Sequence, residues 1–199
     1  LSTGNLYRDK RGLTHANTVP SSIGAVMTHL SNQQIEQALR NSECLISSIE
    51  VSAAYERLAA SVNLHYAGQN PIVMVVMNGG LIPAGQLLTQ FTFYHRMHYI
   101  HATRYRNNAG TNELEWKFKP DVPLAGEDVL LIDDIFDEGI TLKAVVDELQ
   151  KEQPKTIRTC VLLNKIHDRK VQDFNVDFVG LEVADRYVYG CGMDYHGYL

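Results

Sequence analysis

The stretch VLLIDDIFDEGITL, residues 129–142, decides the fold of this chain. Its first four residues are apolar and are followed at once by two adjacent carboxylates, Asp133 and Asp134. A short apolar run of this kind is typical of a strand that is covered on both faces. Beyond a turn of small and acidic residues, apolar side chains recur at 142, 145, 146 and 149, which predicts an amphipathic helix. The stretch therefore predicts a buried strand, a turn and a helix, the repeating unit of an α/β fold.

The turn at 133–141 has the composition of a site for a phosphorylated sugar. Open α/β sheets bind ligands at the carboxyl ends of their strands, and the N–H groups that open a helix favour a phosphate. The two carboxylates are placed to hold sugar hydroxyls. A second apolar strand at 72–77 leads through Asn78-Gly79-Gly80 into a predicted helix at 81–88. This turn is either a second anion site or a tight connection that uses glycine for backbone reasons alone.

Three other interpretations compete for residues 129–142. A Walker B strand would require a G-x-x-x-x-G-K-[ST] loop, and the sequence contains none. A phospho-acceptor receiver domain carries its acids after the first strand, whereas here they lie two thirds of the way along the chain. A plain strand-turn-helix with solvated acids remains, but the density of acids and small residues in the turn disfavours it.

Composition limits the class of protein. The chain has 199 residues, 45% of them hydrophobic and 21% charged, which predicts one globular domain with a sizeable core. A net charge of −5 argues against a nucleic-acid or anionic-membrane partner. No apolar run approaches the roughly 20 residues of a membrane span, and the polar N-terminus shows no secretory signal. Three separated cysteines without a C-x-x-C pattern indicate reduced thiols and a cytoplasmic location.

Residues 1–26 show neither a helical nor an alternating pattern. They are expected to be an N-terminal arm, or in part a segment added for expression, with residues 27–199 as a single domain. Ser31 and Gln34 form a capping-box pattern that opens a short helix. Ser52 is a candidate cap for the next helix, which is expected to end near Gly68.

His95, His98 and His101 raise the question of a metal site. The segment 96–102 is rich in strand formers, and on a strand His98 faces away from the other two. No acid or cysteine lies at ligand spacing, so we expect no transition-metal site there. The polar residues 103–112 predict either a surface hairpin or a mobile lid beside an active site.

Two further strands, predicted at 157–163 and 176–183, lead into candidate binding residues. Lys165 follows the first strand and is either a solvated loop charge or a flexible point charge that reaches a ligand carbonyl. Residues 184–195 follow the second strand and mix aromatic with small residues. Aromatics such as Tyr187 usually pack in a core, but a flat purine base also needs an aromatic face to stack on.

Residues 129–142 resemble the phosphoribosyl-pyrophosphate signature of the type I phosphoribosyltransferases. Lys165 and the tail at 185–195 narrow the resemblance to the hypoxanthine(-guanine) phosphoribosyltransferases, because the tail has an aromatic residue two positions after Asp185 and ends in Asp194-Tyr195. The resemblance covers about residues 45–198. It implies a central parallel sheet flanked by helices, with a core at about 45–165. It also implies a small hood built from the N-terminal segment and about residues 166–199.

The resemblance implies a role for each matching position. Asp137 is the expected general acid or base at N7 of the purine, Lys165 contacts its 6-oxo group, and Tyr187 stacks on it. Asp133 and Asp134 hold the ribose hydroxyls directly or through Mg²⁺. The other expected positions are Asp194 at a second Mg²⁺, Glu138, Gly139, Ile140 and Thr141 at the 5′-phosphate, Val188 at the base edge, Asn78 and Gly79 at the pyrophosphate, and Arg104 and Tyr105 in the lid.

Three positions depart from the family pattern. Asn78 stands where a Lys or similar residue usually precedes the glycine of the pyrophosphate loop, and Arg104 stands where the lid usually carries Ser. An Arg that usually follows the Asp194-Tyr195 pair is not found before Leu199. Each of these changes bears on pyrophosphate binding or on closure of the lid.

The reaction implied is purine salvage, in which 5-phosphoribosyl passes from phosphoribosyl pyrophosphate to hypoxanthine or guanine and yields IMP or GMP with pyrophosphate. Mg²⁺ is the expected cofactor, and a homodimer or homotetramer is the expected assembly. Two alternatives stay open: a phosphoribosyltransferase for another base, such as xanthine or a pyrimidine, and a non-catalytic regulator that senses phosphoribosyl pyrophosphate. The acidic charge and the lack of a helix-turn-helix pattern in residues 1–50 argue against the regulator.

Overall fold

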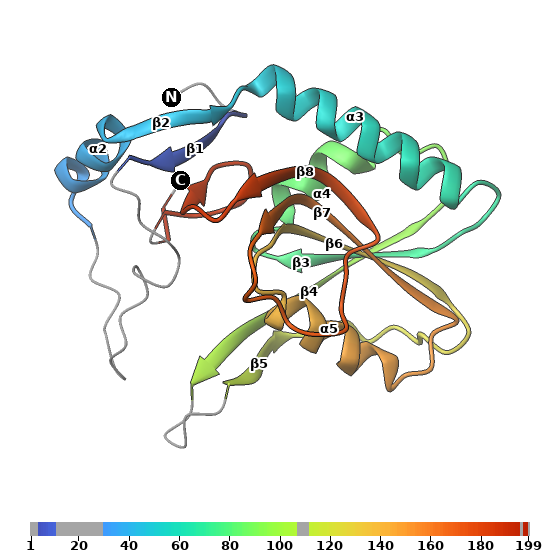
Figure 1. The fold of residues 1–199 in the computed structure, drawn as a ribbon. Coiled ribbons are helices and arrows are strands. Elements are labelled where there is room, and N and C mark those ends of the chain that lie inside the picture. The colour runs from blue at the N-terminus through green and yellow to red at the C-terminus, as the bar shows by residue number, and fades with distance from the viewer. Residues whose placement is uncertain (1–3, 11–29, 107–111, 196, 199) are drawn as a thin grey trace.

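The computed structural model describes residues 4–10, 30–106, 112–195 and 197–198, without the side chains of 9, 104–106 and 112–114. Its main sheet has six strands in the order β5-β4-β3-β6-β7-β8 (Figure 1). Neighbouring strands are parallel except for the antiparallel edge pair β4–β5. The strands are β3 Ile72–Met77, β4 Arg96–Arg106, β5 Asn112–Phe118, β6 Asp128–Phe136, β7 Thr156–Ile166 and β8 Phe178–Ala184.

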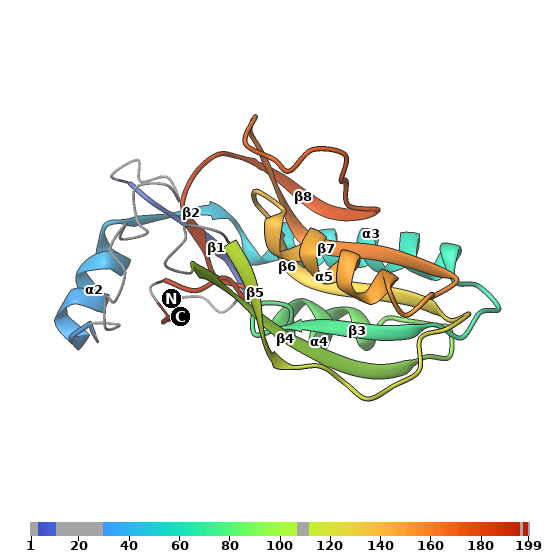
Figure 2. The same ribbon diagram turned by 90° about the horizontal axis from the view of Figure 1, so that it is seen from below.

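Helices cover both faces of the main sheet, which confirms the predicted α/β class. Helices α3 (Ser48–His65) and α4 (Leu81–Leu88) lie on one face, and α5 (Ile140–Gln150) lies on the other (Figures 1 and 2). Successive residues of the central strands alternate between the two layers: Val73 and Leu130 pack in the core with α3, whereas Met74 and Leu131 pack in the core with α5. Burial on both faces explains why these strands are continuous apolar runs in the sequence.

A small second sheet brings the two ends of the chain together. Its order is β2-β1-β9, and β1 (Leu6–Asp9) runs antiparallel to both β2 (Ser42–Ile46) and β9 (Val188–Tyr189). Helix α2 (Asn32–Arg40) precedes β2. The small sheet lies at the end of the molecule toward which the parallel strands point (Figures 1 and 2). We call β1, β2, α2 and β9 the hood.

The hood differs from the expectation in two respects. Strand β1 lies within residues 1–26, for which no regular structure was predicted, because four residues are too few to show an alternating pattern. Strand β8 pairs with β7 in the main sheet. Within the segment 166–199, strand β9 therefore contributes to the hood and β8 does not.

One predicted helix cap is confirmed, and two other predicted boundaries are wrong. Ser31 caps α2 in a capping box with Gln34, as predicted. Ser52 is not a cap: Ser47 caps α3, since Glu50 three residues later completes a capping box there. Strand β6 does not stop before the acids but continues through Asp133 and Asp134, because its pairing with β7 extends as far as Phe136.

Among the described residues, no helix has the length and apolar character that a membrane crossing requires.

Candidate active site

A cleft of about 800 Å³ opens where the carboxyl ends of β3, β6 and β7 meet the hood. The predicted residues that line it are Asn78, Gly79, Asp133, Asp134, Asp137, Glu138, Gly139, Ile140, Thr141, Lys165, Tyr187, Val188 and Asp194. Arg104 and Tyr105 belong to β4 by their backbone, but their side chains lie outside the described residues. The structure thus brings all but the lid residues into one space, and the lid stays a prediction.

The acid pair on β6 places two interacting carboxyl groups next to each other at the cleft. The backbone N–H of Asp134 donates to Asp133 Oδ1 over 2.9 Å, and the side chain of Asp134 is buried. Burial raises the pKa of both carboxyl groups, because a charged group loses its hydration there. Repulsion from Asp134 raises the pKa of Asp133 further, and the charge of Asp194 acts in the same direction on Asp134.

This donor set fits Mg²⁺, since carboxylate oxygens are the ligands that Mg²⁺ prefers. Asp133 and Asp134 would hold one ion and Asp194 a second, and each ion would relieve the repulsion that raises the pKa values of the pair. Within the part of the chain that the structure describes, the one group of three candidate ligands whose atoms all lie within 4.8 Å of one another is Asp137, His167 and Asp185, and it does not include Asp133, Asp134 or Asp194. Its atoms already bond to protein partners, and the histidines at 95, 98 and 101 do not form such a cluster.

The turn after β3 is pressed against the acid pair. A Cβ atom at Gly79 would lie 2.3 Å from Asp134 Oδ2, so only glycine fits. Gly192 has a φ of +111°, and a Cβ there would lie 2.2 Å from the carbonyl oxygen of Gly79. Gly192 lines the cleft and was not predicted, although a glycine within the tail was the available signal. The tail therefore meets the β3 turn through backbone atoms, and the β3 turn lies against the side chain of Asp134 on the acid strand.

The turn after β6 forms the start of α5. Gly139 has a φ of +80° and occupies the N-cap position, and the helix begins at Ile140. The first N–H groups of a helix lack partners within it and favour an anion. The carbonyl of Glu138 accepts a 2.8 Å bond from the backbone N–H of Val171, so a later loop braces this turn. The start of α5 can therefore accept an anion, and Thr141 lines the same cleft.

Asp137 is held by two donors at once. Lys165 Nζ lies 2.7 Å from Asp137 Oδ2, and His167 Nε2 lies 2.8 Å from Asp137 Oδ1. The side chains of Lys165 and His167 are 3% and 5% exposed. The sequence analysis selected Asp137 and Lys165 as separate contacts to a base, whereas the structure pairs them. It missed His167, for which the only signal was a histidine two positions after the predicted lysine.

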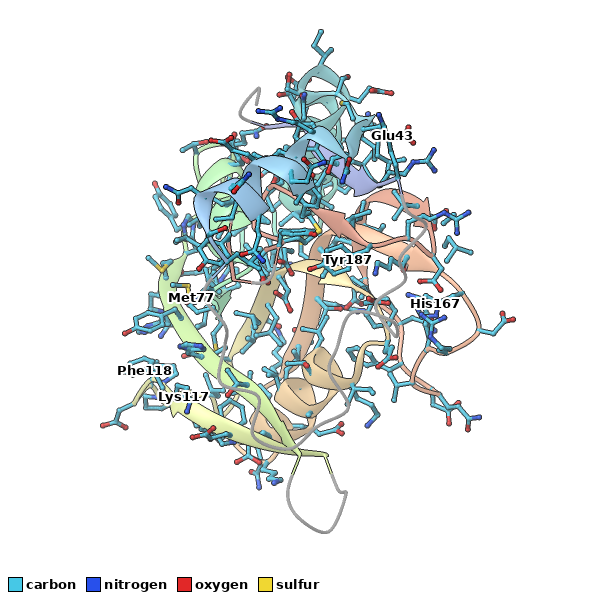
Figure 3. The ribbon with its side chains drawn as sticks, turned by 90° about the vertical axis from the view of Figure 1, so that its left-hand side faces the viewer. Glu43, Met77, Lys117, Phe118, His167 and Tyr187 are labelled. Carbon is cyan, nitrogen blue, oxygen red and sulfur yellow. The ribbon has the colours of Figure 1, made fainter. Side chains whose placement is uncertain are left out.

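The tail supplies an aromatic surface. Tyr187 lines the cleft, and its ring meets Tyr195 edge to face with centroids 5.8 Å apart. The hydroxyl of Tyr187 donates to the carbonyl of Asp194 over 3.3 Å. In the side-chain view Tyr187 lies between Met77 on one side and His167 on the other (Figure 3). These contacts fix a ring that a flat base can stack on.

Acids near the carboxyl end of a central strand, the start of a helix beside them and an aromatic tail in the same cleft form the arrangement expected of enzymes that handle a phosphorylated ribose. Residues 47–196 match the phosphoribosyl transferase domain family. The chain therefore belongs to the phosphoribosyltransferases, which are transferases of the pentosyl group.

Its relatives specify the branch. The chain is 34% identical over 158 residues to a hypoxanthine-guanine phosphoribosyltransferase from Aquifex aeolicus, covering 77% of this chain and 87% of that protein. It is 28% identical over 152 residues to a hypoxanthine-guanine-xanthine phosphoribosyltransferase from Tritrichomonas foetus, covering 76% and 83%. A crystal structure of a hypoxanthine-guanine phosphoribosyltransferase from Bacillus anthracis matches with a TM-score of 0.68 and 26% identity, covering 76% and 88%. These similarities confirm the resemblance to the purine branch.

Proposed function

We propose that this protein transfers the 5-phosphoribosyl group of phosphoribosyl pyrophosphate to hypoxanthine or guanine, giving the nucleoside 5′-monophosphate and pyrophosphate in purine salvage. The observation that carries the proposal is a single cleft lined by the acid pair Asp133 and Asp134, by the start of α5 and by the Lys165–Asp137 pair. The names of the relatives from Aquifex aeolicus and Bacillus anthracis support the same substrates.

The sugar phosphate spans the cleft from β6 to α5. The N–H groups at the start of α5 and the Thr141 hydroxyl bind the 5′-phosphate. Asp133 and Asp134 bind the 2′ and 3′ hydroxyls, directly or through a metal ion. Asp133, Asp134 and Asp194 would hold Mg²⁺, which when bound would supply positive charge to the departing pyrophosphate. The β3 turn at Asn78-Gly79 offers backbone N–H groups to that pyrophosphate.

In the reaction, N9 of the purine bonds to C1′ of the ribose as the bond from C1′ to the pyrophosphate oxygen breaks. Positive charge develops on the ribose ring, as it does in glycoside cleavage. The purine ring must then lose its N7 proton, and Asp137 is placed to accept it. Lys165 donates to the 6-oxo group, Tyr187 stacks on the ring, and the Val188 backbone bonds its edge.

A spectrophotometric assay tests the proposal. The purified protein is supplied with Mg²⁺, phosphoribosyl pyrophosphate and, separately, hypoxanthine, guanine, xanthine and adenine, with an excess of EDTA as the metal-free arm. Turnover of hypoxanthine or guanine that EDTA abolishes is expected. The Asp137→Ala variant, purified identically, controls for host enzymes. No product with either base in the presence of Mg²⁺ would refute the assignment.

Xanthine is the second candidate base, because the relative from Tritrichomonas foetus is named for it as well as for the other two. The same panel decides between them: kcat/KM for xanthine within about tenfold of that for hypoxanthine would place xanthine among the substrates.

The proposal also covers the location, the assembly and the domain organisation of the enzyme. We infer a cytoplasmic enzyme, which three free cysteines support. We infer a homodimer or homotetramer, supported by an exposed apolar face on β4 and β5 where Tyr99 and Phe118 stack with centroids 4.4 Å apart. We also treat the main sheet and the hood, including β1, as one functional domain, so a boundary at residue 27 would separate β1 from the strands that it pairs with.

A further inference from the structure

We propose that His167 is a positioning residue for Asp137: it holds one carboxylate oxygen in place so that the other groups of the cleft meet Asp137 in one orientation. This inference rests on the proposed function, in which Asp137 accepts the N7 proton. Asp137 lines the cleft and His167 does not. His167 lies behind Asp137, with its side chain 5% exposed and its Nε2 2.8 Å from Asp137 Oδ1.

The second ring nitrogen of His167 determines which nitrogen carries the proton. The backbone N–H of Arg169 donates to Nδ1 of His167 over 3.1 Å. An Nδ1 that accepts a hydrogen bond bears no proton, so the neutral ring carries its proton on Nε2. That proton faces Asp137 Oδ1. His167 therefore presents an N–H donor at Nε2 to Asp137, while Nδ1 accepts the bond from Arg169.

The two bonds to Asp137 differ in whether substrate competes for the donor. Lys165 is a flexible side chain whose ammonium carries three donors, and in the proposed function it also reaches the 6-oxo group of the purine. Its bond to Asp137 Oδ2 therefore competes with substrate. His167 has a short, buried side chain and no contact with the cleft. It keeps its bond to Asp137 while substrate arrives, which preserves the carboxylate plane that a general base requires.

The loop that carries His167 is tied to both ends of the cleft. Arg169 forms a two-point ion pair with Asp185, with distances of 2.7 and 3.1 Å, just before the aromatic tail. Lys170 donates to the carbonyl of Phe136 over 3.3 Å and lies 3.6 Å above the centre of its ring. These contacts fix the loop against the turn of Asp137, so the position of His167 is set by the fold rather than by substrate.

The charged groups that surround Asp137 come from several elements. Lys165 approaches from β7, and Arg169 and Lys170 add positive charge from the loop after it. Glu138, the next residue in the turn, and Asp185 before the tail add negative charge. Removal of the His167 donor leaves these charged groups in place. A change in the pH dependence of the reaction therefore reports on the loss of that donor.

Two substitutions separate a hydrogen bond from packing. His167→Gln retains a side-chain N–H that can reach Asp137, whereas His167→Met has similar bulk and no donor. We expect His167→Met to lower kcat about tenfold with KM for phosphoribosyl pyrophosphate changed less than about twofold, and His167→Gln to stay within about threefold of the wild type. Asp168→Asn, at the exposed neighbouring residue, is the matched control and should retain wild-type kinetics.

The pH profile gives a readout that packing alone would not change. A donor to the carboxylate favours its charged form. Loss of that donor in His167→Met should move the acidic limb of kcat/KM to higher pH, by about half a unit or more, while His167→Gln keeps the limb near its wild-type position. Equal kcat and superimposable profiles in the Gln and Met variants would overturn the proposal.

Nitrogen-15 NMR of the imidazole tests the contact without activity. The wild-type signal that disappears in His167→Gln should show a protonated Nε2 and an unprotonated Nδ1 at neutral pH, and it should shift in Asp137→Asn. A signal with Nδ1 protonated would overturn the positioning role even in an active enzyme. An inactive wild type that keeps the expected signal would refute the proposed function and leave the contact itself established.

Discussion

Replacing Asp134 by asparagine is expected to stabilise the unliganded protein while removing most of its activity. The side chain of Asp134 is 8% exposed, and burial raises its pKa from the ordinary 3.8 to about 6. At 1.36 kcal/mol per pKa unit, this difference corresponds to about 3 kcal/mol of folding free energy that the charged form loses. Asparagine has nearly the same shape and no charge, so it avoids that loss.

The gain depends on pH in a defined direction. Because burial raises the pKa of Asp134, the folded protein holds this proton more tightly than the unfolded chain does. The contribution of Asp134 to stability is therefore fully present below about pH 4 and is lost as the pH rises through about 6. The advantage of Asp134→Asn should accordingly be largest near pH 7.5 and disappear near pH 4.

Thermal unfolding in metal-free buffer measures the effect. A gain of about 1 to 3 kcal/mol corresponds to a rise in Tm of roughly 3–10 °C for a chain of this size. Asp168→Asn removes an equal charge from an exposed position and should change Tm by about 1 °C or less. An unchanged Tm of Asp134→Asn at pH 7.5, or the same gain at both pH values, would refute the reasoning.

Three further predictions concern the chemistry of the cleft. Asp137→Ala should lower kcat by a factor on the order of 10² with little change in KM, and equal turnover in steady-state assays would reject its acid/base role. Lys165→Ala should reduce the ratio of kcat/KM for hypoxanthine over adenine and also lower kcat, because Asp137 loses its 2.7 Å partner; an unchanged ratio would contradict the 6-oxo contact. Gly192→Ala should weaken inhibition by pyrophosphate at least about tenfold, since the added Cβ would overlap the Gly79 carbonyl. An inhibition constant of the variant equal to that of the wild type would show that the β3 turn does not bind pyrophosphate.

Part of the site is local in the sequence. Residues 129–142 contain the buried strand, the acids, the Gly139 turn and the start of α5 within one short segment. Neighbouring residues share a strand end whatever the rest of the chain does, so this segment alone predicted an anion site beside two carboxylates. The boundary of β6 was less predictable, because Asp133 and Asp134 stay in the strand only through their pairing with a separate strand.

The sequence by itself determined the layers of the fold, because apolar runs such as 72–76 and 129–132 can only be buried between two helical faces. Only the tertiary structure decided the partners of Asp137. The register of β6 and β7 pairs Phe136 with Asn164, and this brings Lys165 and His167 to the two carboxylate oxygens of Asp137. A shift of β7 by one residue relative to β6 would turn both side chains away from Asp137. The contact of Gly192 with Gly79 has the same origin, since it joins segments that meet only when the tail folds back over the sheet. Contacts between distant segments depend on strand register and loop path, which local residue patterns do not specify.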